Sequence, residues 1–289
     1  MQRNDPCWCG SEKKWKKCHY PEGTPLSFEE LRREYAKKYQ IRIKTAEEIA
    51  GIKKACKLSA EILQKLLEAC REGVTTNEID ALSLKLHADA GATPAPLGYG
   101  SPPFPKSICT SLNEVICHGI PDDVPLKNGD ILNIDTSCIL NGYYGDCSEM
   151  AIIGEISEEK QLVIDVSREC LKRSIAILKP GILVSDIGKV IEDYARSKNC
   201  SVVDDFVGHG VGLEFHEPPQ VPHHYNNTKI PLVPGMIFTI EPMINAGVRS
   251  SVVDKDNQWV ARTGDLKPSA QCEHTILITE TGHEILTLI

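Results

Sequence analysis

Two stretches of the chain repeat each other at almost the same spacing, and this duplication constrains the fold more than any other feature. Residues 125–135 (PLKNGDILNID) match residues 231–241 (PLVPGMIFTIE) after a shift of 106 positions. Residues 73–79 match residues 181–187 after a shift of 108 positions. Two matches in register predict an internal repeat. We therefore expect the 289 residues to contain two similar halves related by a pseudo-two-fold axis.

Helix-capping signals predict two helices in each half. In the first half, Thr45 is expected to cap a helix that runs to about residue 72, and Thr75 a helix that ends before Gly91. In the second half, Ser157 is expected to cap a helix to about residue 178, and Ser185 a helix to about residue 198. Because strand patterns follow each pair, the sequence predicts an α+β fold. Its duplicated helix-helix-strand halves would surround a central antiparallel sheet.

Both repeated strands end on an acidic residue, Asp135 in the first half and Glu241 in the second. A single carboxylate at a strand end is usually solvated, and that is the alternative for each of them. The duplication, however, places the two at equivalent positions. In the second half, Glu273 follows a longer polar connection and could form a pair with Glu241.

A β-hairpin supplies the partner for Asp135. Residues 131–140 and 143–152 flank Asn141-Gly142, a strong signal for a two-residue turn. In that register Ser137 faces Asp146, so Asp135 and Asp146 share one face of the hairpin roughly 7–8 Å apart. Two like charges at this separation are costly unless a cation lies between them.

Four converging carboxylates predict a metal centre. Two divalent ions would neutralise them, and carboxylates combined with an imidazole suit Mn, Fe, Co or Zn. The candidate imidazoles are His118, His209 and His216, which lie in or beside glycine-rich segments where the backbone can approach closely. For any one of them alone, a structural role is the alternative. A structural role is expected for His87, His223, His224, His274 and His283, with a place beside the metal ligands as the alternative for His274, which follows Glu273.

The first 44 residues are basic, whereas the rest of the chain is acidic. They carry eleven Lys or Arg and six Asp or Glu, against 21 and 34 in the remainder. Cys7, Cys9, Cys18 and His19 provide four ligands within thirteen residues, which suits a tetrahedral structural zinc. Lysines beside Trp15 suit RNA or an acidic protein surface, with a solvated face as the alternative. No signal-peptide pattern is present, so scattered reduced thiols in the cytoplasm are expected.

From about residue 43 onward, the chain closely resembles the type I methionine aminopeptidases, which have the pita-bread fold. The matching motifs are NEVICHGIP (113–121), NID (133–135), GD (145–146), GHGVG (208–212), FHEPP (215–219), FTIEP (238–242) and SAQCEH (269–274). The cysteine-rich segment resembles the SEC-C zinc motif. Together these resemblances predict a zinc knuckle over 1–22, a linker with a charged helix near 28–39 over 23–44, and a catalytic domain over 45–289.

The resemblance implies removal of the initiator methionine from nascent proteins, with water activated between two divalent ions. His216 would bond the developing oxyanion, His118 would contact the scissile amide, and Glu241 would shuttle a proton. The segment 98–104 departs from the family pattern, because it is longer and lacks a histidine. The implied metal ligands are Asp135, Asp146, His209, Glu241 and Glu273, and the implied methionine pocket is Tyr99, Phe104, Cys109, Phe215 and Trp259.

Two other functions stay open. One is an X-Pro peptidase of the same fold. An apolar pocket that contains Cys109 favours the thioether side chain of methionine over this alternative. The other is a non-catalytic pita-bread protein that binds RNA or ribosomes, although such proteins typically lack some of the ligands that are present here. The resemblance implies a monomer. The longest apolar runs, such as residues 131–134, are far too short to cross a membrane, so no membrane attachment is expected. The basic zinc knuckle is predicted to dock on the ribosome or on RNA.

Overall fold

The structure is a computed structural model that describes residues 2–7, 13–18 and 26–288. By its internal contacts the chain divides into two units, residues 1–42 and residues 43–289. The domain boundaries expected from the sequence, near residues 22 and 44, stay predictions.

The described residues of the first unit form a small bridged segment, a short 3-10 helix and an α-helix. Pro6 pairs with Lys14, and the 3-10 helix η1 (Trp15–Lys17) follows. The predicted charged helix is α1 (Phe28–Tyr39), which begins at Ser27 with a capping box. Of the four predicted zinc ligands, Cys7 and Cys18 are described, whereas Cys9 and His19 lie outside the described residues.

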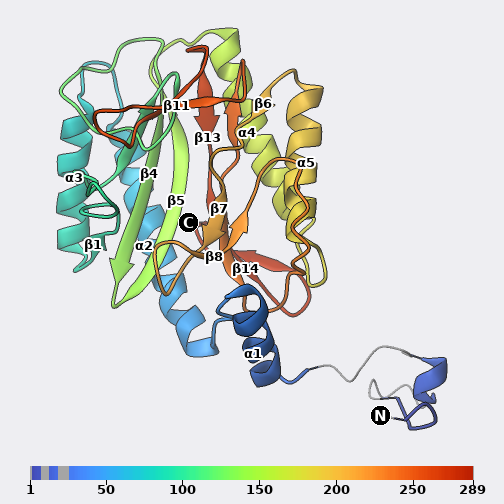
Figure 1. Ribbon diagram of the computed structural model, residues 1–289. Helices are drawn as coiled ribbons and strands as arrows, with labels where there is room; N and C mark the ends of the chain where they lie inside the picture. The colour runs from blue at the N-terminus through green and yellow to red at the C-terminus, as the bar shows by residue number, and fades with distance from the viewer. Residues whose placement is uncertain (1, 8–12, 19–25, 289) are drawn as a thin grey trace. The chain divides into compact units, whose positions relative to one another are not determined.

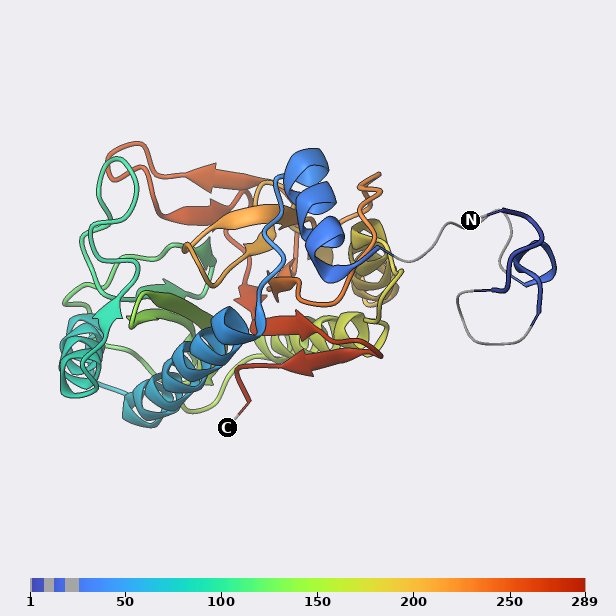
Figure 2. The same cartoon turned by 90° about the horizontal axis from the view of Figure 1, so that it is seen from below.

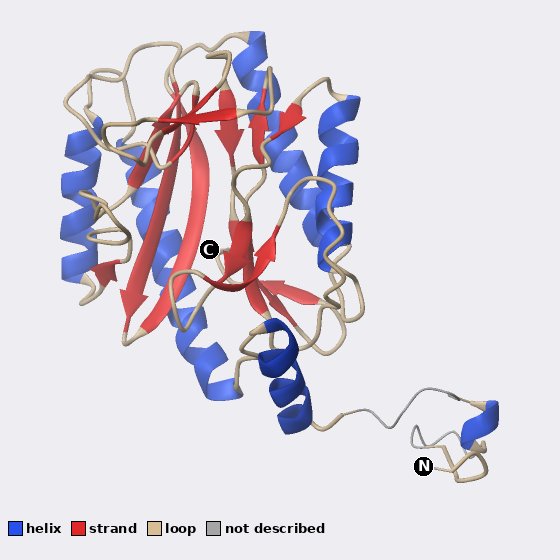
Figure 3. Cartoon of the chain, viewed as in Figure 1, coloured by secondary structure: helices blue, strands red, loops and turns tan. Residues whose placement is uncertain are grey.

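The strands of the second unit form antiparallel sheets (Figure 3). A four-stranded sheet contains β1 (Thr93–Pro94), β2 (Cys109–Leu112), β4 (Ile131–Leu140) and β5 (Tyr143–Ile152). A five-stranded sheet contains β7 (Gly208–Gly210), β8 (Glu217–Val221), β9 (Ile237–Ile240), β14 (His274–Ile278) and β15 (His283–Ile285). The three-stranded sheets contain β3 (Val115–Cys117), β11 (Ser251–Val253) and β12 (Ala261–Thr263), and β6 (Ser201–Val202), β10 (Met243–Asn245) and β13 (Ser269–Gln271).

The helices form two pairs, as predicted. The first pair is α2 (Ala46–Ala69) and α3 (Thr76–Asp89), and the second is α4 (Glu158–Ala176) and α5 (Val184–Ser197). Helix α2 packs on β4 and β5, whereas α4 packs on β10 and β13. Helices α3 and α5 lie at opposite ends of this unit with the strands between them (Figures 1 and 2).

Matching backbone contacts confirm the duplication. Thr75 forms an isolated antiparallel bridge with Pro125, and Leu183 forms the equivalent bridge with Pro231. These pairs reproduce the two shifts of 108 and 106 residues read from the sequence. Two hydrogen bonds beside the bridges match as well, because the N–H groups of Gly73 and Gly181 donate to the carbonyl groups of Leu126 and Leu232, each at 2.8 Å.

Three of the four predicted helix caps are confirmed. The side chains of Thr45, Thr75 and Ser157 each accept a hydrogen bond from the backbone three residues later. The predicted cap at Ser185 is wrong, since α5 begins two residues earlier, after Leu183. No side-chain cap is needed there, because the Val184 and Ser185 N–H groups donate to carbonyl groups of a crossing segment, at Ile230 and Thr228.

The predicted hairpin is confirmed residue for residue. Asn141 and Gly142 both have positive φ, as the tight turn requires, and Ser137 pairs with Asp146. Ile134 and Cys147 point into an apolar core shared with Leu66 of α2. Because side chains alternate across a strand, the neighbours Asp135 and Asp146 point to the other face.

Candidate active site and metal centre

A cavity of about 630 Å³ in the second unit is lined by every side chain predicted for the catalytic site. The segments that supply them are far apart in the sequence, from the loop near residue 99 to the strand that begins after residue 273. The predicted lining residues are Asp135, Asp146, His209, Glu241 and Glu273, with His118 and His216, and with Tyr99, Phe104, Cys109, Phe215 and Trp259.

The five predicted metal ligands come from both halves of the duplication. Asp135 and Asp146 lie on the hairpin β4–β5, and His209 lies on β7. Glu241 and Glu273 directly adjoin the paired ends of β9 and β14, where Ile240 faces His274. The Ser148–Glu273 bridge joins the hairpin to the second half, with a 3.0 Å bond from the Glu273 N–H to the Ser148 carbonyl.

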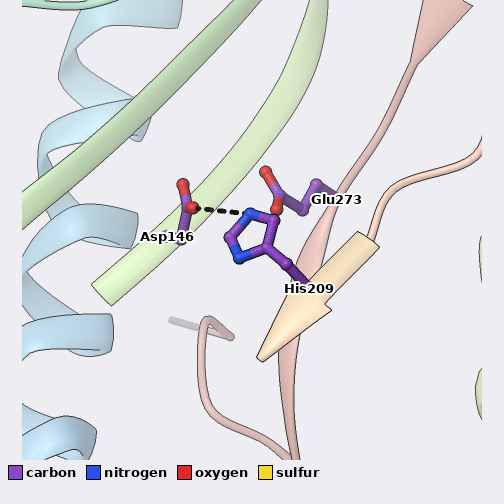
Figure 4. A group of neighbouring side chains, drawn as sticks. All are labelled: Asp146, His209 and Glu273. Carbon is purple, nitrogen blue, oxygen red and sulfur yellow. Dashed lines mark ion pairs between the residues drawn. The ribbon is translucent and has the colours of Figure 1, made fainter. Parts of the chain in front are cut away.

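Three of these ligands converge closely. Single donor atoms of Asp146, His209 and Glu273 all lie within 4.8 Å of one another (Figure 4). The Nε2 atom of His209 lies 3.7 Å from Oδ2 of Asp146 and 3.6 Å from Oε1 of Glu241. The carboxylates of Asp146, Glu241 and Glu273 thus lie close to one imidazole nitrogen inside the cavity.

Neighbouring polar groups orient these ligands. Ser137 donates to Oδ1 of Asp146 at 2.6 Å, and Gln271 donates to Oε2 of Glu241 at 3.0 Å. The Nδ1 atom of His209 lies 3.1 Å from the Gly210 carbonyl. A carbonyl only accepts, so Nδ1 carries the proton and the lone pair of Nε2 faces the carboxylates. Metal-binding histidines are usually held in this way.

The charges of the site fit divalent ions. Burial raises the pKa of Asp146 to about 7. Burial, with repulsion from neighbouring carboxylates, raises the pKa of Asp135, Glu241 and Glu273 well above the usual range. Ionised carboxylates so crowded need a compensating cation. A set of carboxylate oxygens with one neutral imidazole suits the divalent ions expected from the sequence.

The two predicted substrate histidines are neutral and lie among aromatic rings. Burial lowers the pKa of His118 to about 4 and that of His216 to about 2. The His118 ring packs edge-on against Trp259, whereas the His216 ring stacks on Tyr99 with centroids 5.0 Å apart. A neutral imidazole carries one N–H donor and one acceptor nitrogen, so each can form a directed hydrogen bond with a peptide.

The segment 98–104 forms an aromatic wall of the cavity. The Trp259 indole N–H donates to the Pro102 carbonyl at 3.0 Å, and Phe104 packs edge-on against the Trp259 ring. Tyr99 in turn packs edge-on against Phe215 with centroids 4.9 Å apart. Although this segment departs from the expected family pattern, both of its aromatic residues reach the cavity.

The sequence reading missed several residues that support the ligands. The most informative is Thr239 on β9, whose hydroxyl donates to Glu241, two positions later and just after the end of the strand. The period of two along a strand could have indicated it. No local signal indicates His223, whose Nε2 accepts the Glu241 N–H at 3.1 Å, or Phe206 and Met243, which line the cavity.

Three other histidines have structural surroundings. His87 bonds to the Ser83 carbonyl at 2.8 Å, and His283 to the Leu178 carbonyl at 2.9 Å. His274 bonds to the Thr287 hydroxyl at 2.9 Å, which favours a structural role over a place beside the metal. The cysteines of residues 43–288 are free thiols.

The fold and the site define a metal-dependent hydrolase with a duplicated α+β architecture. The pattern of metallopeptidase family M24 matches residues 50–280, and the chain belongs to this family. The methionine aminopeptidase of Chlamydia pneumoniae is 62% identical over all 289 residues and 99% of its own length. The pattern of the SEC-C motif matches residues 3–21.

Solved structures agree with this assignment and confirm the predicted pita-bread fold. The methionine aminopeptidase of Rickettsia prowazekii superposes with a TM-score of 0.83 at 44% identity, over 86% of this chain and all of that one. A prolidase from Pyrococcus furiosus superposes with a lower TM-score of 0.68 at 25% identity, over 93% of this chain and 75% of that one. Within the family, the chain therefore groups with the methionine aminopeptidases.

Proposed function

We propose that this protein removes the N-terminal methionine from newly made polypeptides. One observation carries the proposal: a single cavity collects the carboxylate-rich centre, two neutral histidines and an apolar aromatic wall. The centre suits hydrolysis, the histidines suit a peptide backbone, and the wall suits a thioether side chain. Similarity to methionine aminopeptidases over the whole chain supports the same function.

Asp135, Asp146, His209, Glu241 and Glu273 would hold two divalent ions. When bound, the ions would acidify water and polarise the peptide carbonyl. The chain itself would place the remaining groups. Glu241 would accept a proton from the attacking water and return it to the leaving amine nitrogen. Its hydrogen bonds from Thr239 and Gln271 hold the carboxylate in the cavity.

The two histidines would act on the scissile peptide bond. His216 would donate an N–H to the oxygen that becomes negative in the transition state. His118 would bond the amide of the same bond and align it. Because burial keeps both rings neutral at physiological pH, neither brings a positive charge that would repel the metal ions.

A two-peptide assay with metal analysis tests this function. The full-length protein, loaded in turn with Mn, Fe, Co or Zn, is given Met-Ala-Ser and Ala-Pro-Ser. We expect release of methionine from the first peptide and no cleavage of the second. Release of alanine from Ala-Pro-Ser would favour an X-Pro peptidase. Absence of cleavage with every metal and at every pH would favour a non-catalytic binding protein.

We further propose that Cys7, Cys9, Cys18 and His19 bind one structural zinc in a knuckle that docks the enzyme on the ribosome near emerging chains. The SEC-C match and the basic charge of the first 44 residues support this role. A cytoplasmic monomer fits it. No helix in the described part of the chain is long and apolar enough to cross a membrane.

Deletion of residues 1–24 tests the docking role. The deleted protein should lose one zinc per chain and sediment less with ribosomes, while its kcat on Met-Ala-Ser stays within about twofold. Unchanged cosedimentation would contradict ribosome docking, and unchanged zinc content would contradict the ligand assignment.

A further inference from the structure

A buried ion pair involves Glu217, the residue that directly follows His216 in the chain. Nζ of Lys44 lies 2.8 Å from Oε1 of Glu217, and both side chains are almost fully buried, at 1% and 2% exposure. Two opposite charges removed from water hold each other strongly, because either one left alone would be very costly.

The Glu217 carboxylate also contacts the backbone of residues 210–217, the segment that carries His216. Besides Lys44, Oε1 of Glu217 accepts the backbone N–H of Leu213 at 3.2 Å. Glu217 also pairs with Gly210, and the β7–β8 ladder is irregular between His209 and Gly210. The backbone of residues 210–217, which places His216, is therefore held by contacts with Glu217 at Gly210 and Leu213.

The backbone of Lys44 is itself anchored to the strand that leads to Glu241. Its N–H donates to the Gly235 carbonyl at 2.9 Å, and Gly235 lies just before β9. A Cβ on Gly235 would approach Ile43 to 2.7 Å, so the two segments are in close contact. Lys44 thus connects the strand that leads to Glu241 with the segment that carries His216.

The His216 ring depends on this backbone for its orientation. Across residues 26–288, no protein hydrogen bond to the ring is found, and the ring contacts are with Tyr99, His209 and Phe215. Stacking permits sliding and tilting more readily than a directed hydrogen bond does. The position of the backbone at residues 213–217 consequently decides where the imidazole N–H points.

We propose that Lys44 is a positioning residue, which holds His216 in its working orientation through the buried ion pair with Glu217. This inference rests on the proposed role of His216 in peptide cleavage. A small displacement of an oriented group can lower a rate by about 100-fold without changing substrate binding. The effect of losing the ion pair should thus fall on kcat and not on KM.

A double-mutant cycle tests the path from Lys44 to His216. In the full-length metal-loaded enzyme, Lys44→Met keeps the length of the side chain and removes its charge. We expect kcat on Met-Ala-Ser to fall about 10- to 100-fold with KM nearly unchanged. In a His216→Ala background, the same substitution should lower kcat by less than roughly twofold, because the group it positions is gone. Equal losses in both backgrounds, or no loss in either, would overturn the proposal.

A matched control separates positioning from general loss of an ion pair. Lys53 bonds to Glu284 at 2.7 Å, but both side chains are about half exposed, at 40% and 45%. Lys53→Met should leave kcat unchanged. Metal content and thermal unfolding are measured for every variant, so that loss of metal or of the fold is recognised.

A second variant covers the case in which Lys44→Met does not fold. Glu217→Gln keeps the shape of the side chain and an oxygen that accepts the Leu213 N–H, and it should give the same kcat loss and the same loss of effect in the His216→Ala background. If the wild type cleaves Met-Ala-Ser but Glu217→Gln lowers kcat equally with and without His216, the positioning role is contradicted and the proposed function stands. An inactive wild type would overturn the proposed function and this inference together.

Discussion

The hydroxyl group of Thr239 donates a hydrogen bond to Oε1 of Glu241 at 2.8 Å, and the oxygen that donates also accepts the backbone N–H of His209 at 3.0 Å. One buried side chain therefore sets the separation of two proposed metal ligands. Groups that orient metal ligands typically contribute about 10- to 100-fold to metal affinity.

Thr239→Val is expected to weaken binding of the divalent ions by about 10- to 100-fold, because Glu241 loses its donor and the His209 N–H loses its acceptor. Competition with a chelator measures the affinity. Thr263→Val is the control, since this buried hydroxyl donates to the Lys267 carbonyl at 2.8 Å. An equal loss of affinity in both variants would contradict the role of Thr239.

Glu241→Gln is expected to preserve the fold and to lower kcat on Met-Ala-Ser by about 100- to 10,000-fold, because the amide cannot carry the proton. Circular dichroism checks the fold, and metal analysis at saturating metal checks that the ions are still bound. Glu284→Gln, a change at an exposed carboxylate, serves as the control. Activity within a few-fold of wild type would rule out the proton-shuttle role.

Gly100→Ala is expected to raise KM for methionyl peptides by displacing Trp259. Gly100 has φ of +77°, and a Cβ there would lie 2.5 Å from the Trp259 ring. Gly98 has φ of +80° with nothing within 4 Å of its Cβ. Both alanine variants should lose about 1–2 kcal/mol of stability from the left-handed backbone, but only Gly100→Ala should change KM. Equal KM values would exclude this role for the Trp259 contact.

Removal of metal is expected to make stability depend on pH in an unusual direction. Folding raises the pKa of Asp146 to about 7, and raises the pKa values of Asp135, Glu241 and Glu273. A carboxyl group with a higher pKa in the folded state binds protons preferentially there, so protonation stabilises the fold. The Tm of chelator-treated protein should therefore rise as the pH is lowered from about 8.5 to about 6.5.

Below that window the buried histidines act in the opposite direction. Burial lowers the pKa of His118 and His209 to about 4, whereas in the unfolded chain a histidine takes up a proton near pH 6.5. Acidification there favours unfolding. In protein saturated with metal, the carboxylates stay ionised and the rise in Tm should disappear. Calorimetry across the pH range compares the two forms, and identical profiles would contradict a shared carboxylate centre.

Much of the fold follows from local patterns and from the repeat. The capping residues Thr45, Thr75 and Ser157 and the Asn141-Gly142 turn act through bonds within a few residues, so the sequence alone predicts them. The predicted cap at Ser185 is wrong because the N–H groups of the first turn of α5 donate to carbonyl groups of a segment that is distant in the sequence. No pattern in the sequence near residue 185 indicates such a contact.

The candidate site divides in the same way. The residue types at Asp135, Asp146 and Glu241 and the hairpin register indicated a shared metal centre, and the family resemblance supplied the roles of the individual residues. The sequence did not indicate that Thr239 holds Glu241 and His209 together, or that His223 accepts the Glu241 N–H.

The sequence by itself determined the duplication, the helix pairs, the hairpin and the set of chemically active residues, because each depends on local geometry or on residue type. Only the tertiary structure decided that Lys44 reaches Glu217, 173 positions away, in a buried ion pair beside His216. Contacts between distant segments depend on how the sheets pack. Neither the hydrophobic periodicity of the sequence nor its turn signals predict that packing.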